Sequence, residues 1–159
     1  MHYSYIQLGA SDSGLLKKLL TVFGEAFEEF DTYQSAVPSD AYLRTLLSRP
    51  HFIASVAMSD EKKVVGGLVA YVLEKFERDR REIYIYDLAV LESHRRKGIA
   101  KRLIDELKRL AKERVAYVIF VQADRTDAVA IRLYESLGTK EDVYHFDIKV
   151  DLPNSNLRW

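Results

Sequence analysis

The stretch Tyr84-Ile-Tyr-Asp-Leu-Ala-Val90, followed after four residues by Arg95-Arg-Lys-Gly-Ile-Ala100, decides the fold. The β-branched and aromatic run predicts a strand, and the basic segment with its glycine predicts the start of a helix. The first N–H groups of a helix have no intrahelical partners and carry partial positive charge. Gly98 has no Cβ, so a phosphate can approach the backbone closely. The sequence therefore predicts a pyrophosphate-binding turn after a strand; a helix start with merely solvated Arg and Lys is the alternative.

The composition limits the classes of protein to consider. The 159 residues suit one domain, and 24 basic and 24 acidic side chains balance to zero net charge, which argues against a nucleic-acid binder. There is no cysteine, and the four histidines lack metal-ligand spacing, so we expect no disulfide and no metal site. No long apolar run or signal peptide is present. We therefore expect a cytoplasmic protein that does not bind membranes.

Hydrophobic periodicity places the remaining elements. Strands are expected over 3–8, 51–58, 64–73, 83–91, 115–123 and 143–150. Helices are expected from residue 11 or 12 to about 30, from the Ser39 cap to Pro50, and over 99–114 and 127–137, with loops at 31–37 and 75–82. Gly66-Gly67 inside a strand indicates a bulge or a close backbone approach. The order predicts a single α/β domain over 1–150, with an irregular tail over 151–159.

The segment Arg95 to Ala100 resembles the acyl-CoA-binding motif of the GNAT N-acetyltransferases, Arg/Gln-x-x-Gly-x-Gly/Ala. The order of elements is also that of the GNAT fold, which implies a mixed, mostly antiparallel central sheet flanked by helices. Longer blocks resemble the aminoglycoside 3-N-acetyltransferases of the gentamicin/fortimicin class; among them are Phe23-Gly-x-x-Phe27, Thr32-Tyr33, Tyr71-Val-Leu-x-Lys-Phe-Glu77, Glu82-Ile-Tyr-Ile-Tyr-Asp-Leu-Ala-Val90 and Val121-Gln-Ala-Asp124. The loop after Asp124 departs from that class.

This resemblance implies acetyl-CoA as the cosubstrate. Its pyrophosphate would lie on the basic loop, and its pantetheine arm would lie along the end of the strand like an added strand. A backbone N–H near Leu88 to Val90 would stabilise the oxyanion that forms from the thioester. The cofactor-binding residues are then Leu88, Ala89, Val90, Arg95, Arg96, Lys97, Gly98, Ile99 and Ala100.

Two residues carry the chemistry that the resemblance implies. Asp87 would be the general base, directly or through a water, or would hold the acceptor ammonium by charge. An ordinary Asp, with a pKa near ~4, is a weak base, so burial is needed. Tyr134 would donate a proton to the leaving thiolate. The alternatives are an Asp87 satisfied by backbone N–H groups, and a Tyr134 that contacts CoA without acid chemistry or packs in the core beside Ile131 and Leu137.

The acceptor site should be acidic, because an aminoglycoside carries several ammonium groups. The acceptor-binding candidates are Glu28, Glu29, Asp31, Asp87, Asp124 and Asp142. A solvated surface charge is the alternative for each of them. Asp124 is the strongest candidate apart from Asp87, because strand ends border binding crevices in open α/β sheets.

The resemblance implies acetyl transfer to the 3-amino group of a gentamicin-like aminoglycoside by direct attack in a ternary complex, which would give antibiotic resistance. A GNAT enzyme acting on another polyamine or on a protein amine is the first alternative. A non-catalytic CoA-binding module is the second, although the presence of both Asp87 and Tyr134 speaks against it. A homodimer is also expected from the resemblance.

Overall fold

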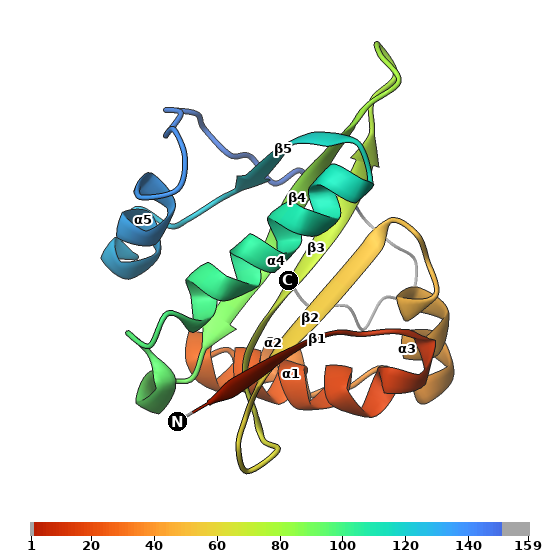
Figure 1. The fold of residues 1–159 in the computed structure, drawn as a ribbon, viewed down its shortest axis with the longest axis vertical. Helices are drawn as coiled ribbons and strands as arrows, with labels where there is room; N and C mark the ends of the chain where they lie inside the picture. The colour runs from red at the N-terminus through yellow and green to blue at the C-terminus, as the bar shows by residue number, and fades with distance from the viewer. Residues whose placement is uncertain (1, 151–159) are drawn as a thin grey trace. The chain divides into compact units, whose positions relative to one another are not determined.

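Five strands form one sheet in the computed structural model, which describes residues 2–150. They are β1 (Tyr3–Gln7), β2 (Phe52–Ser59), β3 (Val64–Glu74), β4 (Arg81–Val90) and β5 (Ala116–Val121), and they lie side by side in that order (Figure 1). Neighbouring strands are antiparallel except β4 and β5, which are parallel. This is the mixed, mostly antiparallel sheet that the sequence predicts.

Helices cover both faces of this sheet. They are α1 (Ser13–Phe27), α2 (Phe30–Gln34), α3 (Asp40–Leu47) and α4 (Ile99–Glu113), with short 3-10 turns at η1 (Ala10–Asp12) and η2 (Glu92–His94). Along β2, Ala54 and Val56 pack with the buried side chains of α1 and α3, whereas Ser55 lies beside Leu103 of α4. Because side chains alternate along a strand, α4 lies on the opposite face from α1 and α3 (Figure 1).

The close backbone approach predicted at Gly66-Gly67 is confirmed. A Cβ on Gly67 would stand 2.5 Å from the Ser55 carbonyl oxygen and 2.6 Å from Cδ1 of Leu19. Leu19 of α1 therefore packs directly on the backbone of β3, where any larger residue would displace it. This contact sets how closely α1 lies to the sheet.

The loop expected over 31–37 is wrong in part, because it contains the helix α2. Glu28 adopts a left-handed conformation, with φ 58°, that ends α1 and turns the chain. The Glu29 N–H then donates to the Gly24 carbonyl at 3.0 Å, and the Tyr33 N–H donates to the Glu29 carbonyl at 3.2 Å. A five-residue helix has little stability of its own, so the local sequence does not predict it. Packing against α1 stabilises it.

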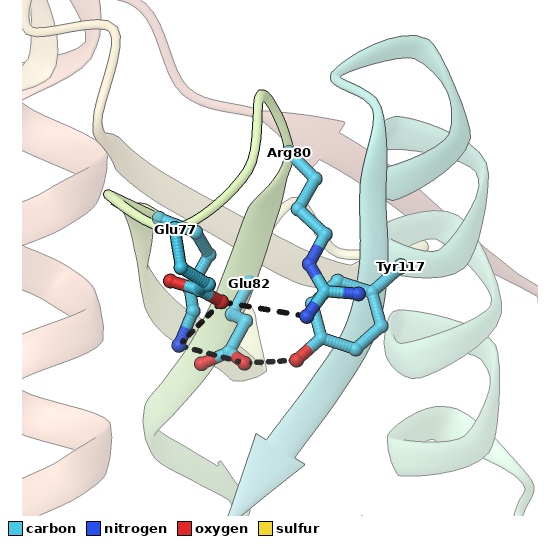
Figure 2. Close-up of polar contacts among 5 residues, drawn as sticks. Glu77, Arg80, Glu82 and Tyr117 are labelled. Carbon is cyan, nitrogen blue, oxygen red and sulfur yellow. Dashed lines mark hydrogen bonds and ion pairs between the residues drawn. The ribbon is translucent and has the colours of Figure 1, made fainter.

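Paired charges hold the connection between β3 and β4 (Figure 2). Lys75 lies 3.6 Å from Glu77 and 3.4 Å from Glu82, and Arg80 lies 3.4 Å from Glu77. The Arg80 guanidinium stands 3.9 Å from the ring centre of Tyr117 on β5, and the Tyr117 hydroxyl donates a hydrogen bond to Glu82. The loop predicted over 75–82 is thus tied to the ends of β4 and β5.

The chain divides into two compact units, Met1–Gln122, which holds the sheet, and Ala123–Trp159. In the described part of the second unit, α5 (Ala128–Glu135) begins at Asp127, whose carboxylate accepts the Ala130 N–H at 2.9 Å. The strand predicted over 143–150 is wrong, since these residues form none, and Tyr144 and Phe146 are 82% and 79% exposed. Alternation indicates a face to bury, but a strand also needs a neighbouring strand, which the pattern does not supply. The tail predicted over 151–159 lies outside the described residues.

Candidate active site

A bulge in β4 decides which way Asp87 faces. Val69 of β3 pairs with Asp87, and Ala70 pairs with Ile85, so Tyr86 has no residue opposite it. Val69 packs in the core beneath α1, which places Asp87 on that face. If Tyr86 paired regularly with Val69 and there were no bulge, the two-residue alternation would put Asp87 on the same face as Ile85, under α4. The bulge therefore aims the carboxylate toward α1 and α2.

The Asp87 carboxylate is largely buried and has a specific partner. The Tyr33 hydroxyl of α2 donates to its Oδ2 at 3.1 Å. Burial raises the pKa of Asp87, the Tyr33 hydrogen bond opposes this rise, and the nearby Glu29 charge adds to it. None of the described groups that shift this pKa is a cation. A carboxylate with a raised pKa is a stronger base than that of an ordinary Asp.

Aromatic rings continue from this carboxylate across the same face of the sheet. Tyr71 and Tyr86 lie edge to face with ring centres 5.8 Å apart, and Tyr84 meets Tyr86 at 5.7 Å. Tyr84 also stacks on Phe120 of β5 at 4.9 Å. Tyr86 is 61% exposed. The acceptor side therefore presents polarisable rings beside acidic groups, an environment that suits cationic, ring-containing molecules.

The end of β4 offers backbone groups to a ligand. Pairing of β4 with β5 stops at Ile85 and Val121, while pairing with β3 continues to Val90. The Leu91 N–H donates to Val65 of β3 at 2.9 Å. Because successive N–H groups point to opposite edges, those of Leu88 and Val90 point away from β3, toward the edge that β5 leaves open. An acyl chain could hydrogen-bond there, as the sequence predicts.

The predicted phosphate loop lies between η2 and α4. Arg96 and Gly98 both have positive φ, 58° and 79°, and these residues turn the chain into the helix. No described neighbouring atom lies within 4 Å of a Cβ built on Gly98, so the space at the helix start is open to a ligand. Arg95 is anchored by its Nε, which donates to the Val90 carbonyl at 3.1 Å, and Lys97 donates to Ser93 at 2.9 Å. These features fit a pyrophosphate against the first N–H groups of Ile99, Ala100 and Lys101.

The predicted acceptor residues fall into two groups. Glu28, Glu29 and Asp31 lie exposed around the turn from α1 to α2, and Glu29 is the one whose charge acts on Asp87. Asp124 and Asp142 belong to the second unit, where Asp142 lies 3.8 Å from Arg125. Among the described residues, no group of three or more His, Asp or Glu side chains could hold a metal ion.

Tyr134, the predicted proton donor, lies on α5. Its carbonyl accepts the N–H groups of Leu137 at 3.0 Å and Gly138 at 2.9 Å, which closes the helix. Its predicted role beside the thioester stays a prediction.

Tyr33, the partner of Asp87, has no role predicted from the sequence, because a loop is expected over 31–37. Thr32-Tyr33 was visible only as one of the blocks shared with the aminoglycoside 3-N-acetyltransferases. Tyr33 and Asp87 are 54 positions apart in the sequence, so no local pattern links the two residues.

Known proteins resemble this chain in both sequence and fold. The acetyltransferase (GNAT) family profile matches residues 16–139. An aminoglycoside acetyltransferase, HMB0005, from an uncultured soil metagenomic sample is 50% identical over 95% of this chain and 100% of its own, with a TM-score of 0.93. Another soil enzyme, meta-AAC0020, crystallised with sisomicin, is 31% identical over 94% of this chain and 97% of its own, with a TM-score of 0.84.

A ribosomal-protein-alanine N-acetyltransferase from Brucella melitensis is 27% identical, over 94% of this chain and 100% of its own, with a TM-score of 0.72. Among the described residues, no helix is both long enough and apolar enough to span a bilayer. The profile covers most of the chain. The chain belongs to the GNAT acetyltransferase family, with the single-domain GNAT fold, and is an acetyl-CoA-dependent N-acetyltransferase.

Proposed function

We propose that this enzyme acetylates an aminoglycoside, at the 3-amino group of its 2-deoxystreptamine ring, and so confers resistance to gentamicin-like drugs. The observation that carries this proposal is the largely buried Asp87 carboxylate, which is bordered by Glu29 and by aromatic rings and has no cation among the described groups that shift its pKa. Such a site favours a molecule with several ammonium groups and ring faces. The similarity to two aminoglycoside acetyltransferases from soil supports the same acceptor class.

In the proposed reaction, the acceptor amine first loses a proton to Asp87, directly or through a water. The amine nitrogen then attacks the thioester carbonyl, so that a C–N bond forms and the C–S bond breaks. The backbone N–H groups of Leu88 and Val90 would stabilise the negative charge on the carbonyl oxygen. Tyr134 would give its proton to the thiolate as it leaves, and the second proton of the attacking nitrogen would neutralise the Tyr134 phenolate, so that a neutral amide and a free thiol remain. Acetylation removes one positive charge from the drug, which weakens its attraction to RNA phosphates.

The phosphate loop would hold acetyl-CoA in place during this attack. The N–H groups that open α4 and the side chains of Arg96 and Lys97 would bind the pyrophosphate, and Gly98 leaves room for it. Arg95 is anchored to Val90, so its remaining N–H groups lie between the loop and the end of β4. The nucleotide half and the acyl half of the ligand would thus meet adjacent parts of the chain.

A protein amine is the second candidate acceptor, because the Brucella ribosomal-protein-alanine N-acetyltransferase shares 27% identity and the fold. The two candidates differ in what they need around Asp87. A peptide needs an open groove for extended backbone, whereas an aminoglycoside needs several negative charges within the span of one small molecule.

The experiment is thiol release from acetyl-CoA with gentamicin, spermidine and an alanine-terminated peptide as parallel acceptors. Fast release with gentamicin alone supports the proposal, and NMR of the product then distinguishes the 3-amino from the 6′-amino group. Release with the peptide and not with gentamicin contradicts it. Expression in a susceptible bacterium, compared with an Asp87→Asn control, tests the resistance role. The cytoplasmic location and the homodimer stay predictions.

A further inference from the structure

A hydrogen bond joins the short helix α2 to the proposed base on β4. The Tyr33 hydroxyl donates to Oδ2 of Asp87 at 3.1 Å, across 54 residues of sequence. We propose that Tyr33 is the positioning residue for Asp87: it fixes the carboxylate by Oδ2 and leaves Oδ1 to meet the acceptor ammonium. This inference rests on the proposed role of Asp87 in the reaction.

Two rings of α1 hold the Tyr33 ring in place. Its centre lies 5.7 Å from that of Phe23 and 5.8 Å from that of Phe27. Phe23 is 1% exposed, so one of the two rings that contact Tyr33 belongs to the core. The ring positions fix where the hydroxyl stands relative to β4. A carboxylate held by a fixed donor loses little freedom when the acceptor arrives, which is what a positioned base requires.

The protonation states suit this role. Burial raises the pKa of Tyr33, and the Asp87 charge raises it further, so the phenol keeps its proton and stays a donor at neutral pH. The same hydrogen bond lowers the pKa of Asp87 against the effect of burial. Tyr33 therefore keeps a larger fraction of Asp87 ionised and able to accept a proton. Without the hydroxyl, the pKa of Asp87 rises and less of the base is available at a given pH.

The other titratable groups around Asp87 come from three neighbouring segments. They are Glu29 before α2, Tyr71 of β3, and Tyr84 and Tyr86 of β4. Of these, Glu29 alone carries a carboxyl group. Its charge raises the pKa of Asp87, in the direction opposite to the Tyr33 hydrogen bond. Loss of the Tyr33 hydroxyl should therefore move the acid limb of the pH–rate profile to higher pH, the direction opposite to that expected from loss of the Glu29 charge.

The test compares two Tyr→Phe variants that each lose one phenol–carboxylate hydrogen bond to β4. Tyr33→Phe removes the donor to Asp87 and keeps the ring that packs on α1. Tyr117→Phe removes the donor to Glu82 and is the matched control (Figure 2). With gentamicin as acceptor, we expect Tyr33→Phe to lower kcat/KM by about 10- to 100-fold. We also expect its acid limb to move to higher pH and its KM for acetyl-CoA to stay unchanged, while Tyr117→Phe behaves as the wild type.

Asp87→Asn separates this inference from the function on which it rests. If Asp87→Asn is inactive while Tyr33→Phe keeps the wild-type rate and acid limb, the positioning role is overturned and the proposed base stands. If Asp87→Asn turns over at the wild-type rate, the role of Asp87 itself fails. The double variant should lose no more than Asp87→Asn alone, and additive losses would overturn the coupling. If only spermidine is acetylated, the same variants are compared with spermidine, since the positioning role does not depend on the aminoglycoside.

Discussion

Replacing Gly67 with alanine should destabilise the protein, although the new side chain is a single methyl group. That methyl would stand 2.5 Å from the Ser55 carbonyl oxygen and 2.6 Å from Cδ1 of Leu19. Carbon atoms make contact at about 3.5 Å, so Leu19 and α1 must retreat by about 0.9 Å or β3 must move. The Ser55 oxygen belongs to the backbone of β2, so no side-chain rotation can move it away from the new methyl group.

Overpacking of this kind costs about 1–3 kcal/mol, and the reduced freedom of the unfolded chain returns about 0.4–1 kcal/mol. We expect a net loss of about 1.3 kcal/mol in the free energy of unfolding, which lowers Tm by roughly 3–5 °C for a chain of this length. Turnover should fall as well, because α1 carries Phe23 and Phe27, the rings that hold Tyr33.

Gly14→Ala in α1 is the matched control for the same chemical change. A Cβ on Gly14 would meet nothing within 4 Å. Alanine favours a helix over glycine, so we expect this variant to gain about 0.5–1 kcal/mol. Urea unfolding of both variants and the wild type gives the two differences. Equal shifts, or a Gly67→Ala variant as stable as the wild type, would refute the packing argument.

Three other perturbations follow from the site. Asp87→Asn should lower kcat by about 10²- to 10⁴-fold and leave acetyl-CoA binding intact by calorimetry. Burial raises the pKa of Asp87 in the folded protein above its pKa in the unfolded chain. The Asp87 charge therefore begins to destabilise the fold as pH rises past the unfolded-state pKa, and does so fully above the folded-state pKa. At pH 7 the Asp87→Asn variant should unfold no more easily than the wild type, and easier unfolding would contradict this. Gly98→Ala should lose about 1–2 kcal/mol of stability from its φ of 79° and should also bind CoA more weakly; unchanged CoA affinity would speak against the loop as the pyrophosphate site. Tyr134→Phe should lower kcat and leave the acceptor KM unchanged, and a raised KM with unchanged kcat would indicate a binding role instead.

The turn before α4 and its flanking elements could be predicted because their signals are local. The β-branched run of β4, the glycine before α4 and the 3.6-residue spacing along α4 each lie within a few turns of chain. The cap at Ser39 was visible for the same reason, and its side chain accepts the Tyr42 N–H at 3.2 Å. Periodicity also located the five strands of the sheet, since each has a face to bury.

The same rule predicted a strand over 143–150 that the structure lacks, because alternation describes a face and not a partner strand. It also missed α2, whose single turn depends on Phe23 and Phe27 of another helix. Marginal elements of this kind take their stability from contacts that are distant in sequence.

The sequence by itself determined that a basic, glycine-containing turn follows a strand of the sheet, and that an aspartate lies near the end of that strand. Only the tertiary structure decided what that aspartate faces. The bulge opposite Val69 and Ala70 turns Asp87 from the α4 face to the α1 face, and the fold brings the Tyr33 hydroxyl to it. A one-residue shift in strand pairing reverses the direction of every side chain beyond it, and pairing is a relation between strands that one strand's own sequence does not encode.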